Sequence, residues 1–309
     1  MDLSVIICTY NRAVSLKNTL ESLCGQAVPV GVSWEVVVVD NNSTDDTPAL
    51  LAATVAEWEG RLRFVREERQ GLSHARNRGI AEARGRYLAF TDDDVLAPSG
   101  WVSVLYETFE KGGWDAIGGR VLLRCDRSMP RWLKPELWGF LACLDYGDEE
   151  MPLTEIERPF FGANMVFRRE VFEKVGGFDV GLGRKGKVLV GGEEIDLFGR
   201  MLASGLRVVY QPRAAVDHVV DPRRLRKGYF RRLHYTSGRV WGMRRDDLNG
   251  WTFLGVPLFL FRQLVRSAGV FMSEGFRNGF QNVFRKEMNI WFHLGFMRGR
   301  MLAHSRRMQ

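Results

Sequence analysis

The chain of 309 residues has only four cysteines, Cys8, Cys24, Cys125 and Cys143, and no two of them form a C-x-x-C pair. No group of cysteines and histidines has the spacing of a zinc module, which argues against a zinc-binding domain. Scattered cysteines also give no disulfide framework, so we expect a reducing compartment. The N-terminal MDLSVIICTY has no basic segment before its apolar run and no small-residue cleavage site, so no secretory signal is predicted.

Two further patterns are missing. Neither G-x-x-x-x-G-K-[ST] nor G-x-G-x-x-G follows the first apolar run, so a nucleotide would not be held by a P-loop or a dinucleotide fingerprint. No apolar stretch reaches 18 residues. The run in the C-terminal region, Trp251–Phe261, has 11 residues before Arg262, and a membrane-spanning helix is therefore not predicted.

What the sequence does have is an uneven distribution of charge. Residues 221–309 contain 18 Lys and Arg against 5 Asp and Glu, a net charge of +13, whereas residues 1–220 have a net charge of −6. A mildly acidic body followed by a strongly basic tail predicts two parts with different tasks. The tail should meet something anionic, either a membrane surface or a nucleic acid.

The body alternates short apolar runs with helical patterns, which predicts an α/β sandwich. Continuous apolar runs are typical of strands buried on both faces of a parallel sheet. Residues 13–24 have the spacing of an amphipathic helix, Ser43 or Thr44 could cap the second helix, and Gly85 could end the third. The predicted strands are Leu3–Cys8, Trp34–Asp40, Arg61–Val65 and Arg86–Thr91.

Carboxylates follow two of these predicted strands. Asp40 ends the second run, and Asp92, Asp93 and Asp94 follow the fourth. In open α/β sheets, ligands bind outside the carboxyl ends of the strands. Carboxylates there could bind hard divalent cations. Alternatively, the segment at Asp40 could be a helix cap and Asp92–Asp94 a solvated loop. Their shared position favours a binding site.

The motifs SVIICTYNR, VVVVDNNSTDDT, GLSHARNRGI, YLAFTDDD and GGEEIDLFGR resemble, in order and spacing, glycosyltransferase family 2 over residues 3 to 220. The resemblance implies a metal-dependent, inverting enzyme with the GT-A fold, a Rossmann-like α/β/α sandwich with a mostly parallel central sheet. It implies a catalytic domain at residues 1–220, with a nucleotide-sugar half at about 1–97 and an acceptor half at about 98–220. It also implies Mn²⁺ or Mg²⁺ and a nucleotide-sugar donor, for which UDP is the commonest nucleotide in the family.

The resemblance assigns roles to individual residues. The Asp-x-Asp motif of the family maps to Asp92 and Asp94 as metal ligands, with Asp93 as an alternative because the triple Asp leaves the register open. His218 matches a further ligand, and neutral imidazole suits Mn²⁺ better than Mg²⁺. The residues expected to bind the donor are Thr9, Tyr10, Arg12, Asp40, Asn42, Arg76, Asp92 and Asp93.

The segment GGEEIDL offers the general base that an acceptor hydroxyl needs. In the family the second acidic residue of this motif is usually the base, which points to Glu194, although the usual residue there is Asp. Glu193 and Asp196 are the alternatives. Asn164 is a candidate contact for donor or acceptor, and the Gly- and Lys-rich segment 181–192 is typical of a mobile lid.

The C-terminal region 221–309 mixes arginines with aromatic residues, which favours helices that lie in a membrane interface. Packing on the catalytic domain and binding of single-stranded nucleic acid are the alternatives, and we expect no nucleic-acid partner. The predicted enzyme is peripheral on the cytoplasmic face of the inner membrane and acts on a polyprenyl-diphosphate-linked glycan in surface-polysaccharide assembly. The oligomeric state is left open.

Two other functions fit parts of the sequence. A catalytically degenerate nucleotide-binding scaffold could keep the same fold, but carboxylates in all three expected places disfavour it. A sugar-1-phosphate nucleotidyltransferase also uses an α/β fold and a metal. Such an enzyme needs a Gly-rich loop after its first strand, and CTYNR has none.

Overall fold

The computed structural model describes residues 1–184, 191–245 and 251–307. These residues form two compact units. The first contains residues 1–124, 142–184 and 191–219, and the second contains residues 125–141, 220–245 and 251–307. Residues 185–190 of the expected lid lie outside the described residues, so the lid stays a prediction.

The first unit is built on one nine-stranded sheet in which β3, β2, β1 and β4 run parallel to one another. These strands are β1 (Leu3–Thr9), β2 (Trp34–Asp40), β3 (Leu62–Arg66) and β4 (Tyr87–Asp92). All seven residues of β2 are buried, as expected for a strand covered on both faces. The α/β fold class predicted from the apolar runs is confirmed.

Beyond β4 the sheet becomes mixed, because β8 pairs antiparallel with both β4 and β6, while β6 and β9 are parallel. The short strands β5 and β7 pair antiparallel with β9. Sequence-distant segments therefore meet at one edge of the sheet. The strands of this half are β5 (Val95–Leu96), β6 (Ala116–Arg124), β7 (Met151–Pro152), β8 (Asn164–Arg168) and β9 (Val208–Val219).

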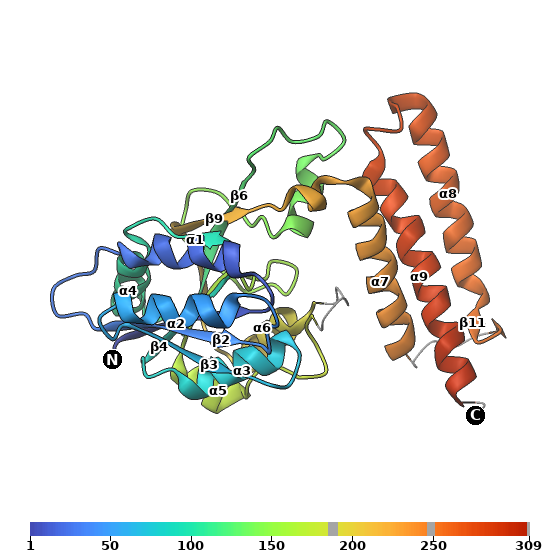
Figure 1. Ribbon diagram of the computed structural model, residues 1–309. Helices are drawn as coiled ribbons and strands as arrows, with labels where there is room; N and C mark the ends of the chain where they lie inside the picture. The colour runs from blue at the N-terminus through green and yellow to red at the C-terminus, as the bar shows by residue number, and fades with distance from the viewer. Residues whose placement is uncertain (185–190, 246–250, 308–309) are drawn as a thin grey trace. The chain divides into compact units, whose positions relative to one another are not determined.

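The α-helices of the first unit connect the strands, and α3 packs on β1 and β2 while α4 packs on β9 (Figure 1). The first helix has the predicted bounds. The helices are α1 (Ala13–Cys24), α2 (Thr47–Glu57), α3 (Leu72–Glu82), α4 (Trp101–Gly112), α5 (Arg169–Val175) and α6 (Glu193–Ala203).

Two predictions about helix ends are wrong. Gly85 does not end α3, which stops at Glu82; a Cβ at Gly85 would lie 2.5 Å from the backbone nitrogen of Ser4, so glycine is required there by close packing on β1. Neither Ser43 nor Thr44 caps α2, because Asp46 is the residue that precedes its first turn. The hydroxyl of Ser43 accepts from the backbone N–H of Asn11 at 2.9 Å and so joins the loops after β1 and β2.

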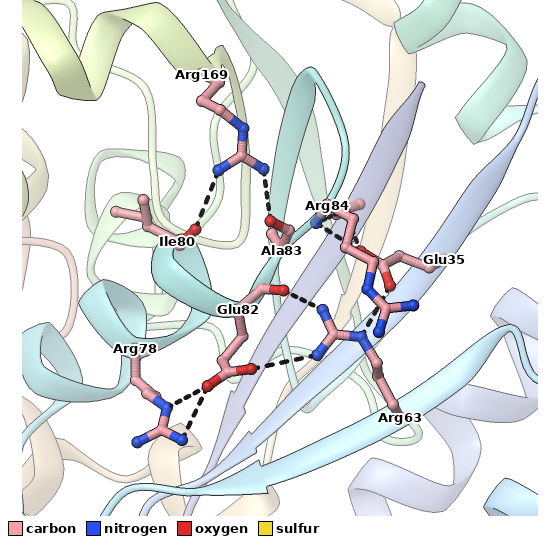
Figure 2. A network of polar contacts seen from close by, with 9 residues as sticks. Glu35, Arg63, Arg78, Ile80, Glu82, Ala83, Arg84 and Arg169 are labelled. Carbon is pink, nitrogen blue, oxygen red and sulfur yellow. Dashed lines mark hydrogen bonds and ion pairs between the residues drawn. The ribbon is translucent and has the colours of Figure 1, made fainter. Parts of the chain in front are cut away.

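The C-terminal end of α3 is held by arginines from two other elements (Figure 2). Arg169 donates to the carbonyl of Ala83 at 2.6 Å, and Arg63 of β3 donates to the carbonyl of Glu82. The last carbonyls of a helix lack partners within it, so these guanidinium groups satisfy them. Arg63 also bonds Glu35 of β2 at 2.9 Å, which fixes this end of α3 against the sheet.

In the second unit, the long helix α9 lies between the helices α7 and α8 (Figure 1). Gly238 and Gly242 of α7 face Gly295 and Gly299 of α9, and a Cβ on any of them would overlap a backbone carbonyl of the other helix. The two backbones are therefore in direct contact. The elements are η1 (Pro135–Leu141), η2 (Pro222–Leu225), α7 (Lys227–Arg244), β10 (Thr252–Phe253), β11 (Val256–Pro257), α8 (Leu258–Asn278) and α9 (Phe284–Arg307).

The apolar run that begins at Trp251 does not form one helix. Its first residues form the hairpin β10–β11, whose two-residue turn has positive φ at Leu254 (51°) and Gly255 (75°). Positive φ at both central positions matches the twist of a tight hairpin. Among the helices in the described parts of the chain, none is both long and apolar enough to cross a membrane.

Candidate active site

Three adjacent parallel strands end at the same level of the sheet. Thr9 is the register partner of Asp40 on β2, and its neighbour Cys8 is the partner of Asp92 on β4. Neighbouring strands lie about 4.8 Å apart. The sheet therefore brings two acidic strand ends together with Thr9 between them, as the sequence predicted for the carboxyl ends of parallel strands.

Asp92, Asp94 and His218 form a candidate metal-binding group, since one ligand atom from each lies within 4.8 Å of the others. The pairing of β5 with β9 positions the histidine, because Val95 is the register partner of His218 and the carbonyl of Asp94 accepts from the N–H of Val219 at 2.8 Å. The Nε2 atom of His218 lies 3.2 Å from an oxygen of Asp94. Two carboxylates and an imidazole can together hold a divalent metal ion.

Asp93 is not part of the group formed by Asp92, Asp94 and His218. Its carboxylate accepts from the hydroxyl of Thr9 at 2.7 Å and pairs with the Nε atom of Arg12 at 3.0 Å. Burial, with repulsion from Asp94, raises the pKa of Asp93 to about 7 although Arg12 opposes the shift. Arg12 also binds Asp94 at 2.5 Å, so one guanidinium joins two members of the triple Asp.

The other residues expected to bind the donor lie around the loops after β1 and β2. Asp40 is buried, and one of its oxygens accepts from the N–H of Ser43 at 2.9 Å. Tyr10 is exposed at the end of β1, and Asn42, with a positive φ of 65°, accepts from Arg66. The structure therefore brings Thr9, Asp40 and the triple Asp together, with Tyr10 and Asn42 on the rim.

Arg76 lies in a second acidic cluster, formed with the first turn of α6. Its guanidinium binds Glu193 at 2.9 Å and Glu194 at 3.2 Å. The resemblance assigned this arginine to donor binding, and its contact with the glutamates was missed. Burial alone would lower the pKa of Arg76, but the nearby carboxylates of Glu194, Glu193 and Asp92 raise it overall, so the arginine stays charged.

The two glutamates differ although they are adjacent. Glu193 is buried, and burial together with repulsion from Glu194 raises its pKa to about 7. Glu194 is partly exposed; burial acts to raise its pKa, but Arg76 lowers it overall. Asp196, the third candidate base, forms an ion pair with Arg200 at 2.8 Å. Of the two glutamates, Glu194 is therefore the one that is both partly exposed and ionised at neutral pH.

Gly162 makes room for this cluster, and no sequence argument identified it. A Cβ there would lie 2.5 Å from a carboxylate oxygen of Glu194 and would overlap Arg76. The signal was available as the glycine in FFGAN, just before β8. Asn164, expected to contact donor or acceptor, is instead fully buried, and its amide nitrogen donates to the carbonyl of Ala214 at 2.6 Å.

Comparison with known proteins places this geometry in a family. Residues 4–176 match the family model described as glycosyl transferase family 2. The chain is 30% identical over 223 residues to the glucosyl-dolichyl phosphate glucuronosyltransferase of Haloferax volcanii, covering 71% of this chain and 69% of that protein. It is 28% identical over 248 residues to the succinoglycan biosynthesis protein ExoM of Rhizobium meliloti, covering 78% and 74%.

The fold is also similar to solved glycosyltransferases. The mannosyltransferase PcManGT from Pyrobaculum calidifontis, determined with GDP-Man and Mn²⁺, has a TM-score of 0.62 and 18% identity, covering 99% of this chain and 86% of that one. GalNAc-T7 with UDP, GalNAc and Mn²⁺ has a TM-score of 0.58 at 18% identity, covering 81% and 53%. The predicted GT-A fold is confirmed, and the chain belongs to glycosyl transferase family 2 and is a glycosyltransferase.

Proposed function

We propose that the enzyme transfers a sugar from a nucleotide diphosphate sugar to an acceptor hydroxyl with the help of Mn²⁺ or Mg²⁺. The observation that carries the proposal is the group of Asp92, Asp94 and His218. It lies beside the carboxyl ends of β1 and β2, which are at the same level of the sheet. Asp40, Asn42 and Thr9–Arg12 would bind the nucleoside, and UDP is the first nucleotide to test. The relevant solved relatives were determined with Mn²⁺ and either GDP-Man or UDP.

The residues present fit a divalent cation. Asp92, Asp94 and His218 would hold it, and the Nδ1 atom of His218 is buried without a hydrogen-bond partner among the described residues. A bound cation would neutralise charge that develops on the diphosphate leaving group. Arg12, already paired with Asp93 and Asp94, lies where it could bind phosphate oxygens as well.

Glu194 is the residue that we propose as the general base. The acceptor hydroxyl must lose a proton as its oxygen attacks the sugar carbon, and a carboxylate that is ionised and partly exposed can accept it. Arg76 would hold Glu194 in place through the 3.2 Å contact. Attack from the side opposite to the leaving group would invert the anomeric configuration, as the resemblance to inverting enzymes implies.

The acceptor that we propose is a lipid-linked glycan. Haloferax glucuronosyltransferase is named for a dolichyl phosphate substrate, and ExoM for the biosynthesis of a polysaccharide. A polyprenyl-diphosphate carrier would place the enzyme peripherally on the cytoplasmic face of a membrane. The net charge of +13 over residues 221–309, which we propose as a separate C-terminal region after a catalytic domain at 1–220, supports such a location.

A thermal-shift screen tests the proposal. We expect one nucleotide sugar among UDP, GDP and dTDP sugars to raise the melting temperature only with Mn²⁺, because a ligand at 100 times its Kd stabilises the folded state by about 2.7 kcal/mol. Asp94→Asn should lose the shift, and Asp148→Asn, at an exposed carboxylate outside the site, should keep it. A shift that needs no metal, or one that survives in Asp94→Asn, would contradict the proposed site.

A further inference from the structure

One exposed stripe of α8 is apolar. Leu258, Val265, Met272 and Phe276 are all exposed, and their spacings of seven, seven and four residues place them on one side of the helix. The exposed fraction reaches 72% at Val265 and 76% at Phe276. We call these four residues the outer face of α8.

Packing within the second unit does not explain the outer face. The side of α8 that contacts α9 contributes Leu260, which clusters with Val256, Phe296 and Met297. A helix on the surface of a water-soluble protein usually has polar residues opposite its packed side. Here the exposed part of α8 has an apolar stripe beside its arginines, and such a stripe is typical of an interaction surface.

Exposed aromatic residues extend the outer face at both ends. The hairpin before α8 presents Trp251, which is 88% exposed, with Phe253 and Leu254, and the N–H of Leu258 donates to the carbonyl of Trp251 at 2.9 Å. At the other end, Phe280 is exposed beside Phe276. The 21 residues of α8 alone span about 31 Å, so the apolar surface is long and narrow.

The charges beside the outer face are positive. Arg262, Arg266 and Arg277 are exposed on α8, and the single acidic residue of the helix, Glu274, pairs with Lys286 of α9 at 3.6 Å. Such a surface complements anionic lipid headgroups, each nearby arginine contributing about 1 kcal/mol. A second copy of α8 would bring arginines together, and like charges in contact oppose association.

We propose that α8 and the β10–β11 hairpin lie in the interface of an anionic membrane, with the outer face of α8 and Trp251 among the acyl chains and the arginines at the headgroups. An amphipathic helix parallel to the membrane plane binds in this way without spanning it. This deepens the proposed function, which requires a membrane surface but does not say which elements bind it.

Flotation with vesicles of phosphatidylglycerol and phosphatidylcholine tests the surface. Wild type should float at low salt, and Val265→Glu/Met272→Glu should lower the ratio of bound to free protein at least about tenfold, because a hydrated carboxylate removes apolar area from the interface. Val30→Glu, the same change at a fully exposed valine of the first unit, should float like wild type. Arg262→Glu/Arg266→Glu should lose the preference for anionic vesicles.

Equal flotation of the double variant and wild type would overturn the proposal. So would a wild type that sediments as a dimer without lipid and a variant that is monomeric, since the outer face would then be a contact between copies. The nucleotide-sugar thermal shift of the double variant should match that of wild type. That control shows that the variant is folded and separates failure at the membrane surface from failure of the proposed chemistry.

Discussion

Two acidic clusters of the first unit are each joined by one arginine, but the two arginines differ in burial. The side chain of Arg76, which binds Glu193 and Glu194, is 3% exposed, whereas that of Arg12, which binds Asp93 and Asp94, is 33% exposed. Arg76 comes from a helix and Arg12 from the loop after β1. The guanidinium of Arg76 is therefore enclosed by the protein, and that of Arg12 borders on solvent.

The balance of charge also differs between the cluster around Arg76 and the cluster around Arg12. Around Arg76 the buried cation keeps Glu194 ionised, while one carboxylate oxygen of Glu193 is buried without a hydrogen-bond partner among the described residues. Around Arg12 three consecutive aspartates face one guanidinium and one imidazole, and the pKa of Asp93 rises to about 7. Buried carboxylates in excess favour a further cation. We infer that the Arg76 cluster accepts the proton and that the Arg12 cluster binds metal and diphosphate.

Replacement of Glu194 should have the largest effect, and it should separate proton transfer from binding of the donor. Glu194→Gln keeps the shape of the side chain and removes its ability to take a proton, so kcat should fall by roughly 10² to 10⁴. Metal-dependent donor binding should barely change, because the base faces the acceptor. Steady-state kinetics with donor titration by calorimetry measures both. Activity within a few-fold of wild type would transfer the role of base to Glu193 or Asp196.

A smaller effect should separate the two arginines. Arg76→Ala leaves two carboxylates without their buried cation, and the free energy of unfolding should fall by about 3–5 kcal/mol. Arg12→Ala should lower the free energy of unfolding by less, since Thr9 and His218 still contact the aspartates. Chemical denaturation with and without Mn²⁺ checks this. Mn²⁺ should restore stability to the Arg12 variant more than to the Arg76 variant, and equal restoration would contradict the division between the clusters.

The smallest effect concerns pH. The folded-state pKa of Glu193 is raised to about 7 from an ordinary value of 4.5, so between these values the native state holds a proton that the unfolded state has released. Stability contributed at this site therefore falls as pH rises from about 4.5 to 7. The Glu193→Gln variant has no carboxyl group to titrate at this position, so it should not lose stability in this way. Its free energy of unfolding should rise relative to that of wild type across this window, and parallel profiles would show that Glu193 does not titrate there.

The local sequence was enough to predict the parallel half of the sheet. Leu3–Cys8 and Trp34–Asp40 are continuous apolar runs. Such runs are typical of strands that are buried on both faces of a sheet. Because parallel strands end at one edge, the hydrophobic pattern alone places Asp40 and Asp92–Asp94 together. Motif resemblance added the roles that we propose for His218 and Glu194, which periodicity alone could not supply.

Other features did not follow from the hydrophobic pattern. The geometry of a two-residue turn decided the hairpin after Trp251, and packing on β1 decided the end of α3 at Glu82. Whether Asp93 or Asp94 turns toward His218 depends on the pairing of β5 with β9, more than 120 residues apart in sequence.

The sequence by itself determined which residues carry charge and, to within one residue, where the parallel strands end, because the hydrophobic pattern is a local property. Only the tertiary structure decided that Arg76 joins Glu193 and Glu194, since α3 and α6 must first pack with Gly162 between them for the three side chains to meet. The electrostatics of Glu194 follow from that packing, because burial and the distance to Arg76 set its charge.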